Sequence, residues 1–143
     1  MPGVDAAFRA TAYRVDAGEA LYELRVGVSN EAFDACLRRR SVSSWALITA
    51  YNPGAMVSDA ANQRAHRRLG DRLRALEWPF LPACNVPDHG VPPVEPGFVL
   101  LQVGESEARE VAAEFFQQAF LCGTIGNAPR LVYISAAARF PEQ

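Results

Sequence analysis

The sequence predicts a single α+β domain over residues 1–143, with a mixed or largely antiparallel sheet of five to seven strands packed by about three main helices. Short alternating strands near both ends of the chain are typical of hairpins, which favour antiparallel pairing over a doubly wound parallel sheet. Helical periodicity recurs in three longer segments. Half of the 143 residues are hydrophobic, so a chain of this length can bury a sufficient core without a disulfide.

In the first half of the chain, segments whose apolar residues alternate, as in strands, are interspersed with segments whose apolar residues recur at helical spacing. Ser29 is the expected N-cap of a helix that ends at an arginine triplet, where positive charge suits the helix dipole. A nearly continuous apolar run predicts an interior strand that Asn52-Pro53-Gly54 ends. The expected elements are a helix over 4–10, strands over 11–15 and 20–26, a helix from Ser29 to Arg40 and a strand over 45–51.

The second half contains a long amphipathic helix and a proline-rich stretch. Ser58 or Asp59 begins a helix that ends near Glu77, with arginines on its solvated face. Six of the ten prolines lie between residues 79 and 96, which predicts a rigid irregular excursion with at most a short strand over 81–86. The expected elements after it are a strand over 98–103, a helix capped by Ser106 whose apolar stripe reaches Ala119, and strands over 120–122 and 130–135.

Composition excludes several classes of protein. All 14 basic residues are arginine, which excludes Schiff-base enzymes, Walker A nucleotide sites, protein kinases and hydrolases that need Ser-x-x-Lys. A net charge of −2 predicts no bulk attraction to nucleic acid or to an anionic membrane. Neither a secretory signal nor an apolar run of membrane-spanning length is recognisable. We therefore expect a cytoplasmic protein, and its arginine and alanine bias is typical of a GC-rich bacterial genome.

The cysteines and histidines give no strong sign of chemistry. Three cysteines, without a C-x-x-C pair, are expected to be reduced and mostly buried thiols. Only two histidines occur, and the local cluster of Cys84, Asp88 and His89 matches no zinc spacing. The sequence therefore predicts no metal site and no cofactor, and it identifies no catalytic residue.

The passage from the strand over 45–51 into the helix at Asp59 is the best candidate for a binding site, because backbone N–H groups at a helix start attract anions. The same passage could also be only a structural turn. Asn62 projects onto the apolar side of its helix, so its amide either ties down the loop over 52–57 or faces a cavity. The sequence-based hypothesis is a cleft for a small polar or anionic ligand, lined by Asn52, Asn62, Arg64, Glu95 and Gln117.

A second hypothesis is a non-enzymatic interaction module with a protein partner. Tyr51, Trp78 and Phe80, with the proline-rich loop over 78–96, would then form an exposed apolar contact surface. The two hypotheses differ in space. Polar residues that converge in a concave pocket favour ligand binding, whereas an exposed aromatic patch favours a protein partner.

Several short strings resemble an uncharacterised bacterial domain-of-unknown-function family (DUF3293-like). They are the stretch from Trp45 to Pro53, Ser58 with Asn62 and a following arginine, a glutamate that opens a hydrophobic strand at Glu95, and a Phe-x-Gln-x-Ala string over 115–119. The resemblance spans roughly residues 8–134. The chain departs from the family pattern at Ala61, Pro96-Gly97 and Phe116. The resemblance implies no particular reaction.

Overall fold

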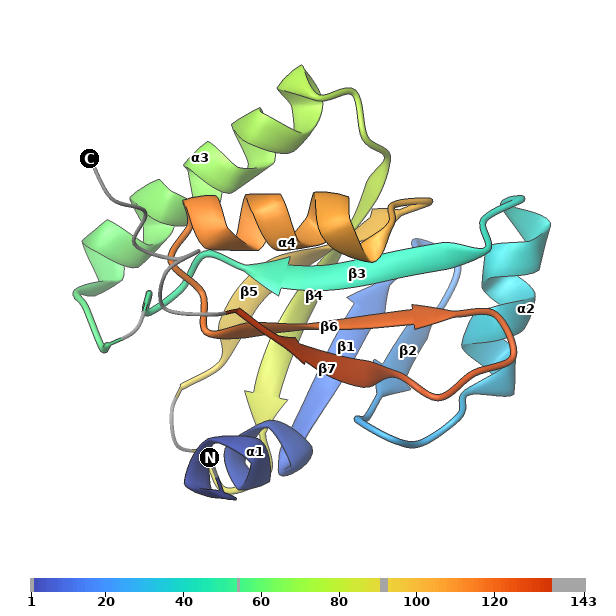
Figure 1. Ribbon diagram of the computed structural model, residues 1–143, viewed down its shortest axis with the longest axis horizontal. Coiled ribbons are helices and arrows are strands. Elements are labelled where there is room, and N and C mark those ends of the chain that lie inside the picture. Colours follow the sequence, from blue (N-terminus) through green and yellow to red (C-terminus); the bar gives the residue numbers. More distant parts are fainter. Residues whose placement is uncertain (1, 54, 91–92, 135–143) are drawn as a thin grey trace.

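One antiparallel sheet of seven strands organises the computed structural model, which describes residues 2–53, 55–90 and 93–134 (Figure 1). The strand order is β2-β1-β4-β5-β3-β6-β7, and every pairing within this part of the chain is antiparallel. The predicted α+β class is therefore confirmed. The elements are α1 (Pro2–Arg9), β1 (Thr11–Asp16), β2 (Leu21–Leu24), α2 (Glu31–Arg39), β3 (Ser44–Thr49), α3 (Asp59–Ala75), β4 (Phe80–Pro87), β5 (Glu95–Leu101), α4 (Glu105–Glu114), β6 (Ala119–Thr124) and β7 (Arg130–Tyr133).

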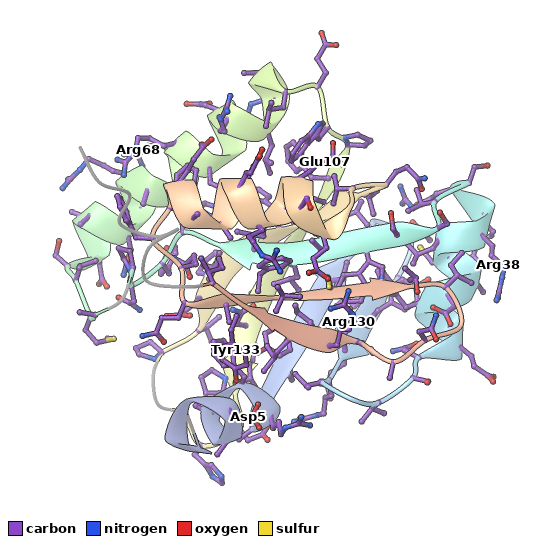
Figure 2. All side chains as sticks on the ribbon, in the orientation of Figure 1. Asp5, Arg38, Arg68, Glu107, Arg130 and Tyr133 are labelled. Atoms are coloured by element: carbon purple, nitrogen blue, oxygen red, sulfur yellow. The ribbon has the colours of Figure 1, made fainter. Side chains whose placement is uncertain are left out.

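The sheet curls until its two edges approach each other. The backbone N–H of Gly27, just after β2, donates to the carbonyl oxygen of Pro129, just before β7, at 2.8 Å. Helix α1 bridges the same two edges, because Tyr13 of β1 donates to the Phe8 carbonyl and the Tyr133 hydroxyl of β7 donates to Asp5. Figure 2 shows Asp5 and Tyr133 side by side. The sheet face that carries Tyr13 is therefore the concave one.

Each face of the sheet has its own hydrophobic core. On the concave face, Phe33, Cys36 and Leu37 of α2 pack against strand side chains such as Leu47 and Leu121. On the convex face, α3 and α4 cover the sheet (Figure 1), with buried residues that include Leu69 and Val111. Strand β3 has both faces buried and lies between β5 and β6, which confirms the predicted interior strand.

The short strand predicted over 81–86 within the proline-rich segment is present as β4, which extends one residue further at each end and lies inside the sheet. Strand β4 pairs with both β1 and β5 despite its prolines. Pro82 lies beyond the residues that pair with β1, and Pro87 lies beyond those that pair with β5. Each proline therefore lies where one neighbour is missing, and the loss of its N–H interrupts neither ladder in the middle.

Two predicted helix starts shift by one or two residues. Asn30, not Ser29, caps α2: its amide oxygen accepts from the Phe33 N–H, and its amide nitrogen donates to the Glu23 carbonyl. An asparagine can therefore cap the helix and bind β2 at once, which a serine hydroxyl does less well. Helix α4 begins after Gly104 rather than at a Ser106 cap, because the carboxylate of Glu107 accepts from the Gly104 N–H.

The helix ends also differ from the prediction. Helix α3 ends at Ala75, and Glu77 follows with a φ of 59°, so the predicted end near Glu77 is two residues late. Helix α4 ends at Glu114, and Phe116, with a φ of 56°, turns the chain away. Ala119 therefore begins β6 and is not part of the α4 stripe.

The arginines that the sequence assigned to solvated helix faces are exposed. Arg38 at the end of α2 and Arg68 on α3 extend away from the body of the protein (Figure 2). Arg74 pairs with Asp71 on the same exposed face. These contacts need no ligand to explain the arginine clusters.

Candidate functional site

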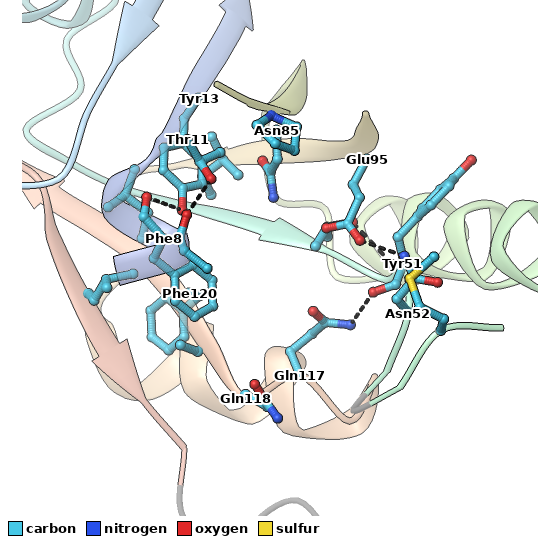
Figure 3. A pocket seen from close by; sticks show the side chains of 18 of the residues that line it. Phe8, Thr11, Tyr13, Tyr51, Asn52, Asn85, Glu95, Gln117, Gln118 and Phe120 are labelled. Atoms are coloured by element: carbon cyan, nitrogen blue, oxygen red, sulfur yellow. Dashed lines mark hydrogen bonds between the residues drawn. The ribbon is translucent and has the colours of Figure 1, made fainter. Parts of the chain in front are cut away.

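A cavity of about 410 Å³ opens on the concave face of the sheet beside α1 (Figure 3). Its wall comes from six of the strands, from α1 and from the segments that follow β3 and α4. The lining residues are Ala7, Phe8, Thr11, Tyr13, Leu47, Thr49, Tyr51, Asn52, Ala55, Met56, Asn85, Pro87, Glu95, Gln117, Gln118, Ala119, Phe120, Leu121 and Leu131.

Strand register explains why the floor of the cavity has a polar half and an apolar half. Residues directly opposite each other in an antiparallel ladder point to the same face. Tyr13 lies opposite Asn85, which lies opposite Glu95, so β1, β4 and β5 contribute one polar row. In the other half, Leu47 lies opposite Leu121, which lies opposite Leu131, so β3, β6 and β7 contribute an apolar row.

Asn52 organises the polar wall where β3 ends. Its amide nitrogen donates to the Glu95 carboxylate at 2.6 Å, and its amide oxygen accepts from the Val57 N–H and from the Asn62 amide. Its φ of 47° is left-handed, a region that asparagine enters more readily than other side-chain-bearing residues. The turn after β3 therefore points the Asn52 side chain at Glu95.

Asn62 lies behind this turn rather than on the cavity wall. It is 3% exposed, its amide oxygen accepts from the Asn52 backbone N–H at 2.7 Å, and its amide nitrogen donates to the Asn52 amide oxygen at 2.9 Å. Of the two alternatives left by the sequence, the geometry matches an amide that ties down the loop. Asn62 is a positioning residue for Asn52.

Glu95 has an unusual setting for a carboxyl group. It is half-buried on the wall, and none of the ion pairs of the described residues includes it. Burial raises the pKa of the Glu95 carboxyl, and the hydrogen bond from Asn52 offsets part of that rise. The carboxylate can therefore serve as a counterion or as a proton acceptor.

Gln117 closes the wall from the side of α4. It is 7% exposed, and its amide nitrogen lies 3.3 Å from the carbonyl oxygens of both Tyr51 and Phe115, to which it donates. Figure 3 shows Gln117 reaching toward Tyr51 across the cavity mouth. The Thr49 hydroxyl holds the same turn, because it donates to the Pro96 carbonyl and accepts from the Tyr51 N–H.

The opposite wall is formed by hydroxyl groups that cap α1. Thr11 donates to the Ala7 carbonyl at 2.7 Å and Tyr13 donates to the Phe8 carbonyl at 3.2 Å. Carbonyl groups in the last turn of a helix lack intrahelical partners, so these hydroxyls satisfy them. Burial raises the pKa of the Tyr13 phenol well above its usual value, so Tyr13 stays neutral.

The structure brings together three of the five predicted site residues. Asn52, Glu95 and Gln117 line the cavity, whereas Asn62 supports Asn52 from behind and the exposed Arg64 is not part of the lining. Sequence reasoning missed Thr11, Tyr13 and Asn85. The alternation over 11–15 places Thr11 and Tyr13 on the buried face of their strand, a signal that could have singled them out. Asn85 lies in the short strand predicted over 81–86, but only the pairing of that strand with its neighbours places it on the cavity wall.

The aromatic residues of the interaction hypothesis do not form an exposed patch. Trp78 and Phe80 are partly buried against the convex core. Tyr51 is half-buried, with its ring edge-on to His66. These three residues therefore offer only part of their surface to a partner, and the interaction hypothesis stays a prediction.

The cysteines are free, with Cys36 and Cys122 buried and Cys84 half-buried, which matches the expectation of mostly buried thiols. Among the described residues, no group of three or more His, Cys, Asp or Glu side chains is arranged to hold a metal ion. Nor is any helix in this part of the chain long and apolar enough to cross a membrane.

Comparison with known proteins identifies the family of the chain. No curated protein and no solved structure matches it. Residues 48–120, half of the chain, match the profile of a family described as "Protein of unknown function (DUF3293)". The matched range includes Asn52, Asn62, Glu95 and Gln117, but not the α1 and β1 side of the cavity. The chain belongs to the DUF3293 family.

Proposed function

We propose that this protein binds a small molecule in the cavity on the concave face. A volume of about 410 Å³ lies within the usual range for small-molecule sites, and such sites combine an apolar lining with a few placed polar groups. The row of Leu47, Leu121 and Leu131 would contact the body of the ligand, and the row that contains Glu95 would orient its polar end.

The observation that carries this proposal is the Glu95 carboxyl group. A half-buried carboxylate normally has a cationic partner in the protein, but within the described part of the chain the Glu95 carboxylate accepts from the neutral amide of Asn52 and forms no ion pair. A group that is costly to bury, fixed in position and directed at a cavity is expected where a ligand supplies the missing partner.

The lining favours a neutral or positively charged ligand. Of the lining residues that the structure describes, none is an arginine or a histidine, so the anionic ligand considered from the sequence gains no support here. We also propose that the protein works in the bacterial cytoplasm, and its three free cysteines support a reducing compartment.

A thermal-shift screen tests the proposal, with neutral, cationic and anionic small molecules added to the wild type and to three variants. Glu95→Gln removes the charge of the wall, and Leu131→Trp fills the apolar half of the cavity. Glu110→Gln is the matched control, because Glu110 is exposed on α4 and does not line the cavity.

We expect at least one compound to raise the melting temperature of the wild type and of Glu110→Gln. At 100 times the Kd, one site stabilises by about 2.7 kcal/mol, which corresponds to roughly 5–11 °C in a domain of this size. Leu131→Trp should lose this rise. The proposal is wrong if no compound raises the wild-type midpoint, or if Leu131→Trp responds as the wild type does.

A further inference from the structure

The hydrogen bonds around the cavity use several of its donors and leave acceptors. The Thr11 and Tyr13 hydroxyl protons go to carbonyl oxygens of α1. The Gln117 amide nitrogen donates to two backbone carbonyls, and that of Asn52 donates to Glu95. What these groups can still offer to a ligand is oxygen lone pairs.

Asn85 gives independent evidence for the same conclusion. It is 8% exposed, it lines the cavity, and its buried amide oxygen accepts no hydrogen bond from any described residue. A buried acceptor without a partner is unfavourable by about 1–3 kcal/mol. Asn85 lies directly opposite Glu95 in the β4–β5 ladder, so the unsatisfied amide and the carboxylate are adjacent on one face.

The charge of the site also favours a ligand that donates hydrogen bonds and carries positive charge. Elsewhere the protein pairs carboxylates with arginines, as in Glu105 with Arg130 and Glu114 with Arg72. Among the described residues, the lining of this cavity contains one carboxyl group and no cationic side chain. The remaining N–H donors of the lining, such as the amide of the exposed Gln118, carry no charge.

We propose that the ligand carries a protonated nitrogen, as an ammonium, amidinium or guanidinium group on an apolar body, which binds the Glu95 carboxylate beside Asn85. Its N–H groups donate to the carboxylate, and its charge supplies the counterion that Glu95 lacks and interacts favourably with the unpartnered Asn85 amide oxygen behind it. Phe8 and the leucine row contact the apolar body. This inference rests on the proposed function, whose ligand class it names.

Three probes of matched size test the charge preference: 2-phenylethylamine, 2-phenylethanol and phenylacetate. Their Kd values are measured by calorimetry at pH 7.5 with the wild type, Glu95→Gln, Asn85→Ala and the control Glu110→Gln. We expect the amine to bind the wild type and the control at least tenfold more tightly than the alcohol, a difference of about 1.4 kcal/mol. Phenylacetate should bind most weakly.

The variants separate the charge from the cavity. Glu95→Gln should bring the amine and the alcohol within about twofold of each other, chiefly by weakening the amine, and Asn85→Ala should weaken the amine several-fold more than the alcohol. An amine that binds the wild type no more tightly than the alcohol overturns the inference and leaves the proposed function standing. So does an amine preference that survives in Glu95→Gln. If none of the probes binds at millimolar concentration, both proposals fail.

Discussion

Replacing Asn62 with alanine tests whether this side chain holds the turn that positions Asn52. The substitution removes two hydrogen bonds, at 2.7 and 2.9 Å, between a 3% exposed amide and Asn52. Two such bonds contribute about 1–3 kcal/mol in total, and leaving the Asn52 N–H without a partner adds a penalty of up to about 3 kcal/mol. Water reaches the half-buried Asn52 and reduces that penalty.

A smaller term acts in the opposite direction. Alanine is a better helix former than asparagine by roughly 0.6 kcal/mol, and residue 62 lies inside α3. The net expectation for Asn62→Ala is a loss of about 2 kcal/mol, or a decrease of roughly 4–8 °C in the melting temperature of a domain of this size.

Gln63→Ala is the matched control, because Gln63 is the next residue of α3 and is exposed. It gains a smaller amount of helix propensity than Asn62→Ala, because glutamine is already a good helix former, and it loses no buried contact, so its stability should stay within about 0.5 kcal/mol of the wild type. Urea unfolding of both variants measures the difference. If Asn62→Ala is as stable as Gln63→Ala, the tie between α3 and the turn is not what the geometry indicates.

Three further predictions concern other parts of the site and the core. Gly97→Ala should destabilise the protein by about 1–3 kcal/mol in urea unfolding, because a Cβ there would lie 2.5 Å from the Ile48 carbonyl oxygen; Gly104→Ala, with no neighbour closer than 3.5 Å, should lose less. In the native protein a thiol reagent should modify the half-buried Cys84 first, and Cys84→Ser should lack this fast phase. The folded-state pKa of Glu95 is raised by burial, so the charge opposes folding as pH rises through that pKa and has no effect below the unfolded value. The melting temperature of Glu95→Gln should therefore equal that of the wild type near pH 3 and exceed it at pH 8. A constant difference across this range would contradict the assignment.

Local sequence pattern predicts most of the fold because most strands here have one clear period. The two terminal hairpins and the apolar run of β3 are found where the sequence places them. Strand β4 was predicted only as a short strand within an irregular segment, because prolines argue against an interior strand. Only the pairing register shows that Pro82 and Pro87 lie where one neighbouring strand is absent, and that register is a long-range property.

The difference between local pattern and long-range pairing also explains which site residues the sequence identified. Asn52 and Glu95 were found because each lies at a strand end beside a strong local signal. Tyr13 and Asn85 reach the cavity only through the pairing of β1 with β4, which no local window contains. Grouping Arg64 with Asn62 was wrong. Side chains two positions apart on a helix point about 200° apart around its axis, so Asn62 faces the turn and Arg64 faces solvent.

Several residues other than glycine have a left-handed backbone, and where each lies in the fold decides what this conformation does. Ser41, Glu77 and Phe116 also have left-handed backbone, but each lies just past the end of a helix, where such a residue commonly ends the helix. Asn52 instead uses this conformation to direct its amide at a carboxylate.

The two buried polar atoms without a hydrogen-bond partner among the described residues also differ in their surroundings. The Nδ1 atom of His66 has no partner among the described residues, but the ring stacks on Phe98 at 4.6 Å, and burial lowers the pKa of His66 and favours its neutral form. The Asn85 amide oxygen has no such compensation and lies beside Glu95 on a cavity wall. A strained turn, an unpaired carboxylate and an unsatisfied amide on one wall are each unfavourable without a ligand. A bound cation would pair with the carboxylate and interact favourably with the amide oxygen, and the convergence of all three on one cavity is the argument for binding there.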